Sequence, residues 1–316
     1  MRCPLCQTES RRFGFARSGS QRYRCDACAK TFTVDSTRAP DRRRVAPEKM
    51  NLALRMLLEG NSIRAVERLT GINRNTIMWA MVAAGEKCQA FFAKAIQNVP
   101  VDDVQCDEIW GFVGMKERTR IHRGLAEDGV GDVWCFTAIE RTTKLILTYH
   151  VGKRTPDDTA TFADNLYHAT QGRFQLTTDG YTPYRRVVPA IFGGRVDFAT
   201  LVKVYGVSED DSRYSPGTVI DVIATPRLGD PDEDRICTSH VERSNKTLRM
   251  QIRRLTRLTD AHSKKWENHE AAMALFFAYY NFCRVHGTIK MTPAQKSGLT
   301  TETWTLERLL SEGGAI

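Results

Sequence analysis

Long hydrophobic runs are absent from this chain of 316 residues. The longest unbroken apolar segment, Ala271 to Tyr280, has 10 residues, about half of what an α-helix needs to cross a bilayer. No hydrophobic region of a signal peptide follows Met1, because Arg2 and Cys3 come next. We therefore expect a soluble, cytoplasmic protein with no membrane partner, in which the cysteines stay reduced.

Acidic residues are scarce in two separate zones. Residues 1–47 hold 11 Lys and Arg against 4 Asp and Glu, and residues 243–265 hold 8 against 1. The net charge of the whole chain is only +9, so the other residues are acidic on balance. Two cationic zones far apart in the sequence predict a polyanionic partner, nucleic acid, that is held at two places.

The cysteines that are present form a pattern. Four of the nine stand in the first 28 residues as two Cys-x-x-Cys pairs: Cys3, Cys6, Cys25 and Cys28. This number and spacing of thiols is typical of a closed tetrahedral zinc site. Disulfides would need an oxidising compartment, and redox use of one pair would leave the other unexplained. We predict a zinc ribbon at residues 1–37, in which Arg22 and Arg24 contact nucleic acid.

Three short helical patterns predict a helix-turn-helix domain at residues 47–85. Asn61 is the expected cap of the second helix, in which Leu69 faces inward, and Asn73 is the expected cap of the third. Glu67 stands where such a turn usually has a small side chain, so a plain helical hairpin is the alternative. The start of the third helix would present three residues to phosphates and base edges: Arg74, Asn75 and Thr76.

A change of period at Pro100, after a linker helix at residues 82–98, marks a larger domain that we predict at residues 100–296. Strand patterns come first and then alternate with helices, which describes an α/β domain. The expected strands are residues 101–113, 133–151, 174–178 and 200–205, and the expected helices are residues 159–170 and 183–191. The acidic stretch at about 207–236, which contains Gly and Pro, predicts an insertion that is a lid, a dimer contact or a disordered loop.

Three carboxylates of this domain have positions that suit catalysis. Asp107 lies among apolar residues of the first strand, and Asp179 follows the end of a later strand, where α/β proteins bind ligands. Glu242 begins a helix that is predicted to continue to Leu255. At about 100° per residue, one face of this helix carries Glu242 and a basic track for a phosphodiester backbone: Lys246, Arg249 and Arg253.

Three converging acids predict two-metal phosphoryl transfer with Mg²⁺ or Mn²⁺, because oxygen ligands suit these ions. The alternative is that Asp107, Asp179 and Glu242 are unrelated surface acids, since their spacing is not diagnostic by itself.

Several segments together resemble insertion-sequence-one family transposases. The N-terminal match is Gln21 to Phe32, preceded by Cys3-Pro4-Leu5-Cys6 and followed by the helical patterns. The larger domain resembles the family at Asp107 to Gly114, Thr178 to Tyr181 and Val241 to Arg249. The resemblance implies an RNase H-like fold, in which Asp107, Asp179 and Glu242 form a metal-binding DDE triad. It also implies that Arg249 is the basic residue placed two helical turns after the Glu.

The function that the resemblance implies is that of a multidomain DNA transposase. Its zinc ribbon and helix-turn-helix would bind the terminal inverted repeats of an element, and its RNase H-like catalytic domain would cleave double-stranded DNA and join it to target DNA as a homo-oligomer. Two alternatives stay open. A non-catalytic zinc-ribbon and helix-turn-helix repressor leaves three acids beside a basic helix unexplained, and an RNase H-like nuclease leaves two DNA-reading modules unexplained.

Overall fold

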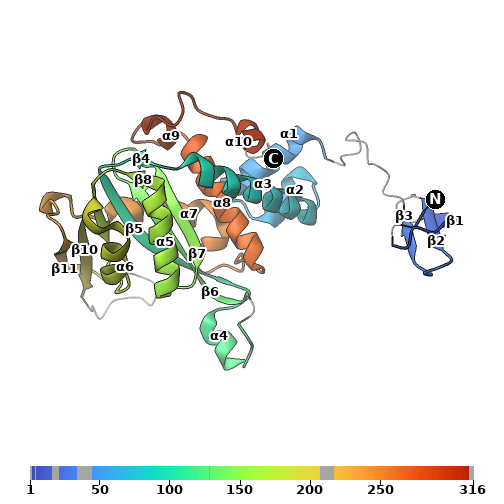
Figure 1. Cartoon of the computed structure of the whole chain (residues 1–316), viewed down its shortest axis with the longest axis horizontal. Helices are drawn as coiled ribbons and strands as arrows, with labels where there is room; N and C mark the ends of the chain where they lie inside the picture. Colours follow the sequence, from blue (N-terminus) through green and yellow to red (C-terminus); the bar gives the residue numbers. More distant parts are fainter. Residues whose placement is uncertain are drawn as a thin grey trace. The chain divides into compact units, whose positions relative to one another are not determined.

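The computed structural model describes residues 2–3, 5–15, 21–33, 45–127, 129–206 and 217–312 (Figure 1). They belong to two compact units, Met1–Pro47 and Glu48–Ile316. Every helix in these ranges is too short or too polar to cross a bilayer. The chain is therefore a multidomain protein with mixed α/β structure.

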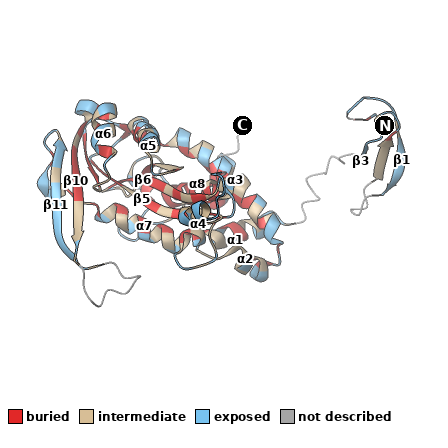
Figure 2. Cartoon of the chain, turned by 90° about the horizontal axis from the view of Figure 1, so that it is seen from below, coloured by how far each residue is buried: buried red, intermediate tan, exposed pale blue. Residues whose placement is uncertain are grey.

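The first unit is a three-stranded antiparallel sheet with almost no hydrophobic core. Its strands β1 (Ser10–Phe15), β2 (Gln21–Cys25) and β3 (Thr31–Thr33) pair in that order. Among its described residues only Cys3 and Cys25 are buried, and Figure 2 shows its strands largely in the colours of partial and full exposure. So little burial cannot offset the entropy of ordering the chain, which leaves the thiols as the available source of stability.

Three helices open the second unit: α1 (Pro47–Leu58), α2 (Ile63–Thr70) and α3 (Arg74–Ala95). Asn73 caps α3 as predicted, because its side-chain oxygen accepts the N–H of Asn75 at 2.9 Å. The predicted cap of α2 is wrong. The Ser62 hydroxyl caps that helix, and the Asn61 side chain instead donates to a carbonyl in the last turn of α1.

The inward face of α2 also differs from the prediction. Val66 and Thr70, four residues apart, are the buried positions, so Leu69 lies beside the buried stripe and is 69% exposed. Gly71 ends α2 in the left-handed region, at a φ of 68°.

α3 is one helix of 22 residues and not a recognition helix followed by a linker helix. Its C-terminal half joins the core of the second unit. At Gly85 it meets α8 (Trp266–Phe282) so closely that a Cβ atom would lie 2.3 Å from the carbonyl oxygen of Ala271. The two backbones are therefore in contact at a point that only glycine permits.

A mixed six-stranded sheet in the order β11-β10-β9-β5-β6-β7 forms the body. Strands β5 (Asp103–Val113), β6 (Gly131–Glu140) and β7 (Ile146–Gly152) pair antiparallel in that order, so the long predicted strand at 133–151 is a hairpin. β9 (Phe174–Thr178) pairs parallel to β5, and β10 (Val196–Tyr205) pairs parallel to β9. The helices α5 (Pro156–Ala169) and α6 (Tyr184–Phe192) cover one face of the sheet, and α7 (Ser239–Gln251) lies on the other (Figure 2).

The other described elements are short. In Figure 1, α4 (Glu117–His122) projects from the sheet between β5 and β6. The rest are β4 (Val99–Pro100), β8 (Thr170–Gln171), α9 (Pro293–Lys296), α10 (Leu306–Glu312) and the 3-10 turns η2 (Gly193–Arg195), η3 (Glu233–Arg235) and η4 (Arg253–Leu255).

Part of the predicted insertion is a strand of the sheet. Residues 207–216 lie outside the described residues, but β11 (Val219–Leu228) pairs antiparallel with β10 along its length. A lid or a disordered loop therefore does not describe residues 219–228. The β-branched residues of Val-Ile-Asp-Val-Ile at 219–223 favour a strand, and the acidic, Gly- and Pro-containing composition of the whole stretch obscured this signal.

Replacing Gly85 by alanine tests the contact between α3 and α8. Alanine favours a helix by about 1 kcal/mol over glycine, but its methyl group would collide with the Ala271 carbonyl. We expect Gly85→Ala to lower the free energy of unfolding by about 1–3 kcal/mol, measured by urea unfolding. Ala93→Gly, at an exposed position of the same helix, should cost only the propensity difference of about 1 kcal/mol. Unchanged or increased stability of Gly85→Ala would exclude the close contact.

Candidate active site and metal centres

Four thiols of the first unit converge on one point. The Sγ atoms of Cys3 and Cys28 lie 3.6 Å apart and those of Cys6 and Cys25 lie 3.4 Å apart, and all four lie within 4.8 Å of one another. The cysteines are free, and a tetrahedral zinc ion with Zn–S bonds of about 2.3 Å would hold its sulfurs at similar separations. A hydrogen bond with Thr8 lowers the pKa of Cys25 to about 6, which favours the thiolate that binds metal. The cluster fits zinc.

Two predicted DNA-binding residues of this unit lie on one face of its sheet. Arg22 and Arg24 alternate along β2, so their side chains share a face. Their guanidinium carbons lie 5.7 and 5.4 Å from the centre of the Phe13 ring. This places two cations around an aromatic side chain that is 40% exposed.

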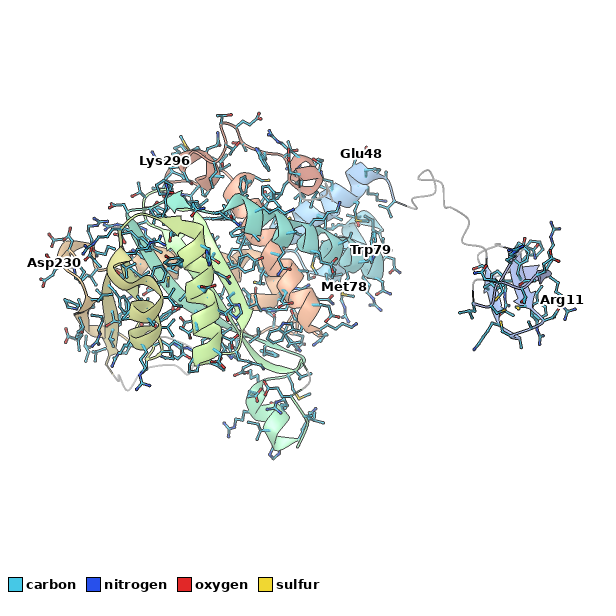
Figure 3. All side chains as sticks on the ribbon, in the orientation of Figure 1. Arg11, Glu48, Met78, Trp79, Asp230 and Lys296 are labelled. Carbon is cyan, nitrogen blue, oxygen red and sulfur yellow. The ribbon has the colours of Figure 1, made fainter. Side chains whose placement is uncertain are left out.

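The predicted base-reading residues lie in the first turn of α3, where Arg74 and Asn75 are exposed and Thr76 is half-buried. Glu67, which is unusual at its position in the turn, has a local explanation. Its carboxylate accepts the backbone N–H of Arg74 at 2.9 Å, so it satisfies a free donor at the start of α3. Sequence reasoning missed Trp79, which is 70% exposed one turn further along α3 (Figure 3).

Two of the three predicted catalytic acids are brought together by strand pairing. β5 and β9 are parallel neighbours, and Cys106 pairs with Thr178 at the end of β9. The next residues, Asp107 and Asp179, therefore sit side by side at the same edge. Carboxylate oxygens of Asp107, Glu108 and Asp179 lie within 4.8 Å of one another.

The third acid, Glu242, lies in the first turn of α7 and is held by a lysine. Lys203 of β10 donates to both of its carboxylate oxygens at 2.5 Å, and the Thr238 hydroxyl donates at 2.7 Å. Glu242 is not part of the 4.8 Å group, although its charge acts on Asp107. Burial raises the pKa of Asp107 to about 6, and the charges of Asp179 and Glu242 add to this effect.

The same face of α7 also contacts Asp107 directly. Asn245, three residues after Glu242, donates its side-chain N–H to Asp107 Oδ2 at 2.8 Å, while the N–H of Glu108 donates to Oδ1 at 2.9 Å. The side-chain oxygen of Asn245 is buried and has no hydrogen-bond partner among the described residues. α7 therefore contacts Asp107 through Asn245, while Glu242 acts on Asp107 through its charge.

Glu108 and Arg154 complete the cluster, and sequence reasoning missed both. Burial, followed by the charge of Asp179, raises the pKa of Glu108 to about 8. Tyr184 donates its hydroxyl to Glu108 at 2.5 Å. Arg154 pairs with Glu108 at 2.9 Å and with Asp179 at 3.3 Å. Its guanidinium lies over the Trp134 ring at 4.7 Å and the Tyr181 ring at 4.1 Å, which fixes its position.

The donor set of this cluster fits a hard divalent cation. It consists of carboxylate oxygens, the ligands that Mg²⁺ and Mn²⁺ prefer, and it offers no thiol or imidazole. Burial first and the charge of Asp179 second raise the pKa values of Asp107 and Glu108, and a bound cation would favour their charged forms.

The basic track of the predicted long helix is not continuous. α7 ends at Gln251, and Arg253 lies in the separate turn η4, so the helix predicted up to Leu255 is wrong. The break lets three residues face inward together: Ile252 and Leu255 join the core, and the Arg254 guanidinium donates to the Asn268 carbonyl at 2.5 Å. In an unbroken helix Arg254 would point away from the other two.

The two other basic residues of the track differ in exposure. Lys246 is exposed on α7. Arg249 is half-buried and donates to the carbonyls of Leu255 at 3.2 Å and Trp110 at 3.5 Å, and burial lowers its pKa to about 10. No described hydrogen bond joins Arg249 to a carboxylate.

No family model matches the chain. Among solved structures, the piggyBac transposase synaptic complex with hairpin DNA is similar to it, with a TM-score of 0.36 and 10% sequence identity over 84% of this chain and 68% of that chain. A TM-score at this level gives no information about function.

Replacing Cys25 by serine tests the sulfur cluster. We expect Cys25→Ser to lose its zinc, measured as metal content after dialysis, because three thiolates and a hydroxyl bind zinc far more weakly. All five tryptophans lie beyond residue 47, so unfolding followed by their fluorescence reports the second unit, which should be unchanged. Cys237→Ser, at a half-buried cysteine of that unit, is the control. Full zinc content in Cys25→Ser would rule out this site.

Replacing Lys203 by methionine tests the oxygen cluster. A cation that binds Glu242 has to displace the Lys203 ammonium, and a partly exposed ion pair contributes about 0.2–1 kcal/mol. Lys203→Met should therefore bind Mn²⁺ up to about fivefold more tightly in the absence of DNA, as measured by calorimetry. Lys246→Met removes an exposed charge of α7 without breaking this pair and should change affinity less. Equal affinities would show that Glu242 is not a ligand.

Proposed function

We propose that this protein is a DNA transposase that binds the ends of its insertion sequence and catalyses metal-dependent DNA cleavage and strand transfer. The observation that supports the proposal is the closeness of Asp107 on β5 and Asp179 after β9, together with the charge of Glu242, at the start of α7, which acts on Asp107. Three antiparallel strands followed by two parallel ones support the RNase H-like assignment of the body.

Within this proposal, Asp107, Asp179 and Glu242 hold Mg²⁺ or Mn²⁺. Two such ions, when bound, would activate the attacking oxygen and stabilise the leaving oxygen of a phosphodiester. The protein's part is orientation: Asn245 fixes one oxygen of Asp107, and the Tyr181 N–H fixes one of Asp179 at 2.9 Å.

Two cations balance the charge of these acids. Arg154, clamped between two rings, pairs with Asp179, and Lys203 pairs with Glu242. Once the carboxylates bind metal, the Lys203 ammonium would be released to pair with a phosphate oxygen of the substrate, while Arg154 stays between its two rings. Arg249 supports the site by donating to the carbonyls of Leu255 in η4 and Trp110 in β5, which makes it a positioning residue in this proposal.

The proposed DNA contacts are made by both units. The zinc ribbon contributes Arg22 and Arg24, and the helix-turn-helix contributes the exposed start of α3: Arg74, Asn75 and Thr76. Lys246 and Arg253, both exposed, would meet backbone phosphates. Action as a homo-oligomer belongs to the proposal as the resemblance implies it.

Conservative replacement of each triad acid tests the proposal. Asp107→Asn, Asp179→Asn and Glu242→Gln should each lower end cleavage and strand transfer by more than about a hundredfold, because changing a residue that only supports a metal ligand already costs about 10–100-fold. Purified protein would be incubated with linear DNA that carries the sequences flanking its own gene, with Mg²⁺, with Ca²⁺ or without metal. DNA binding without metal should persist, since a lost acid removes repulsion from phosphates.

The matched control is Asp102→Asn, which replaces an exposed acid five residues before Asp107 that pairs with Arg235 at 2.9 Å. It should cleave at the wild-type rate. Wild-type cleavage by any triad variant removes that residue from the triad. Binding without cleavage by the wild type would favour the repressor, and cleavage without sequence preference would favour the nuclease.

A further inference from the structure

A cationic cavity lies outside the acid cluster. It has a volume of about 350 Å³ and is formed by α7, the turn between β6 and β7 and the segment after α8. Its charged and imidazole side chains are Lys144, His240, Arg243, Arg284 and His286. No described Asp or Glu is among its lining residues. A concave surface with charge of a single sign attracts an anion.

The lysine of this cavity is held by neutral groups. Lys144 Nζ donates to the Arg141 carbonyl and, at 3.1 Å, to His240 Nδ1. An ammonium can only donate, so His240 accepts at Nδ1 and carries its proton on Nε2. Glu140, the acid whose charge acts most on Lys144, already accepts from the N–H and hydroxyl of Thr143 at 2.5 and 2.6 Å. The charge of Glu140 acts on Lys144, but no described ion pair holds the ammonium, so it can pair with a bound anion.

The two arginines of the cavity have no described ion pair, and its second imidazole offers a donor. Arg284 donates to the side-chain oxygen of Gln251, a neutral acceptor. His286 accepts the Thr288 N–H at Nδ1, 3.3 Å away, which leaves its Nε2–H as a donor. Arg243 is exposed at the rim and has no described ion pair.

The backbone at Lys144 is unusual for this residue type. Its φ is 62°, in the left-handed region that turns normally fill with Gly or Asn. A lysine in this conformation is a local strain, and such strain gathers at functional sites. The turn places the Lys144 side chain in the lining of the cavity, so an anion-binding role would explain a lysine at this position.

α7 separates the cavity from the acids. His240, Arg243, Ser244 and Thr247 recur at helical spacing and line the cavity. Glu242 and Asn245 lie on the opposite flank, with the buried Val241 and Leu248 between the two flanks. A helix with its side chains is about 10–12 Å across, so one phosphate cannot occupy both places.

We propose that the cavity binds a phosphate of the DNA backbone other than the one that is cleaved. α7 then contacts the duplex on both flanks, with the acids at the scissile phosphate and the cations at another. Duplex DNA carries a phosphate charge about every 1.7 Å along its axis, so a second phosphate is available at this separation. The choice of DNA as the source of the phosphate rests on the proposed function.

The test compares salt dependence of DNA binding in EDTA, where no cleavage occurs. Arg243→Gln removes the rim cation, and Lys144→Asn removes the deeper one while asparagine tolerates the left-handed backbone. Each should weaken binding and lower the slope of log K against log salt by about 0.9, the value for one lost phosphate contact. Lys296→Gln, an exposed cation outside the cavity (Figure 3), is the control and should leave the slope unchanged.

Phosphate ethylation interference then identifies the contact. One position that blocks wild-type binding should no longer matter to Arg243→Gln, and it should differ from the cleaved phosphate. Slopes equal to the control, or loss of interference at the cleaved phosphate itself, would overturn the proposal. Inorganic phosphate is the second probe: saturation of the His240 and His286 NMR signals at micromolar phosphate, with unchanged DNA slopes, would assign the cavity to a free anion.

The proposed function fails separately. If the wild type binds DNA but never cleaves it, while both variants lose slope, the cavity remains a DNA phosphate site on a non-catalytic protein. If the wild type cleaves and the variants keep their slopes, only the cavity assignment is wrong.

Discussion

The closeness of two carboxylates on adjacent parallel strands is the constraint on which the rest of the site depends. Because Cys106 pairs with Thr178, the next residues, Asp107 and Asp179, lie side by side. Like charges at this distance in a partly buried place repel, and burial adds to the cost. The surrounding contacts are arranged to offset it: Arg154 at Asp179, Asn245 at Asp107 and Lys203 at Glu242.

The placement of α7 is set by its buried residues Val241 and Leu248. Its buried stripe fixes the helix on the sheet, so its two flanks have to face different neighbours. The flank with Glu242 and Asn245 faces the acids, and the flank with His240 and Arg243 faces the cationic cavity. The helix ends at Gln251, and this break lets Arg254 donate to the Asn268 carbonyl.

The sequence made the individual chemical groups visible, and the tertiary structure decided how they combine. Strand ends predicted the location of Asp179, and Cys-x-x-Cys spacing predicted the thiol cluster that the structure contains. Arg154 and Lys203 gave no signal, because they reach the acids from β-strand and loop positions far away in sequence. Glu108 was not predicted to join Asp107 because consecutive residues of a strand normally face opposite sides of the sheet. The prediction that the helix continues to Leu255 was wrong because helical periodicity can continue through a sequence after packing has ended the helix.

The two clusters have opposite relations to folding. The first unit buries little besides Cys3 and Cys25, so a metal held by its thiols would supply its stability directly.

The second unit has its own hydrophobic core, and its clustered acids lower its stability at neutral pH. Asp107 and Glu108 have pKa values of about 6 and 8 in the folded chain, above the ordinary values of 3.8 and 4.5. The folded chain then binds more protons than the unfolded chain between about pH 4 and 8, so these groups make the free energy of unfolding fall as pH rises through that window. A cation that binds the ionised carboxylates would remove this cost and stabilise the folded chain.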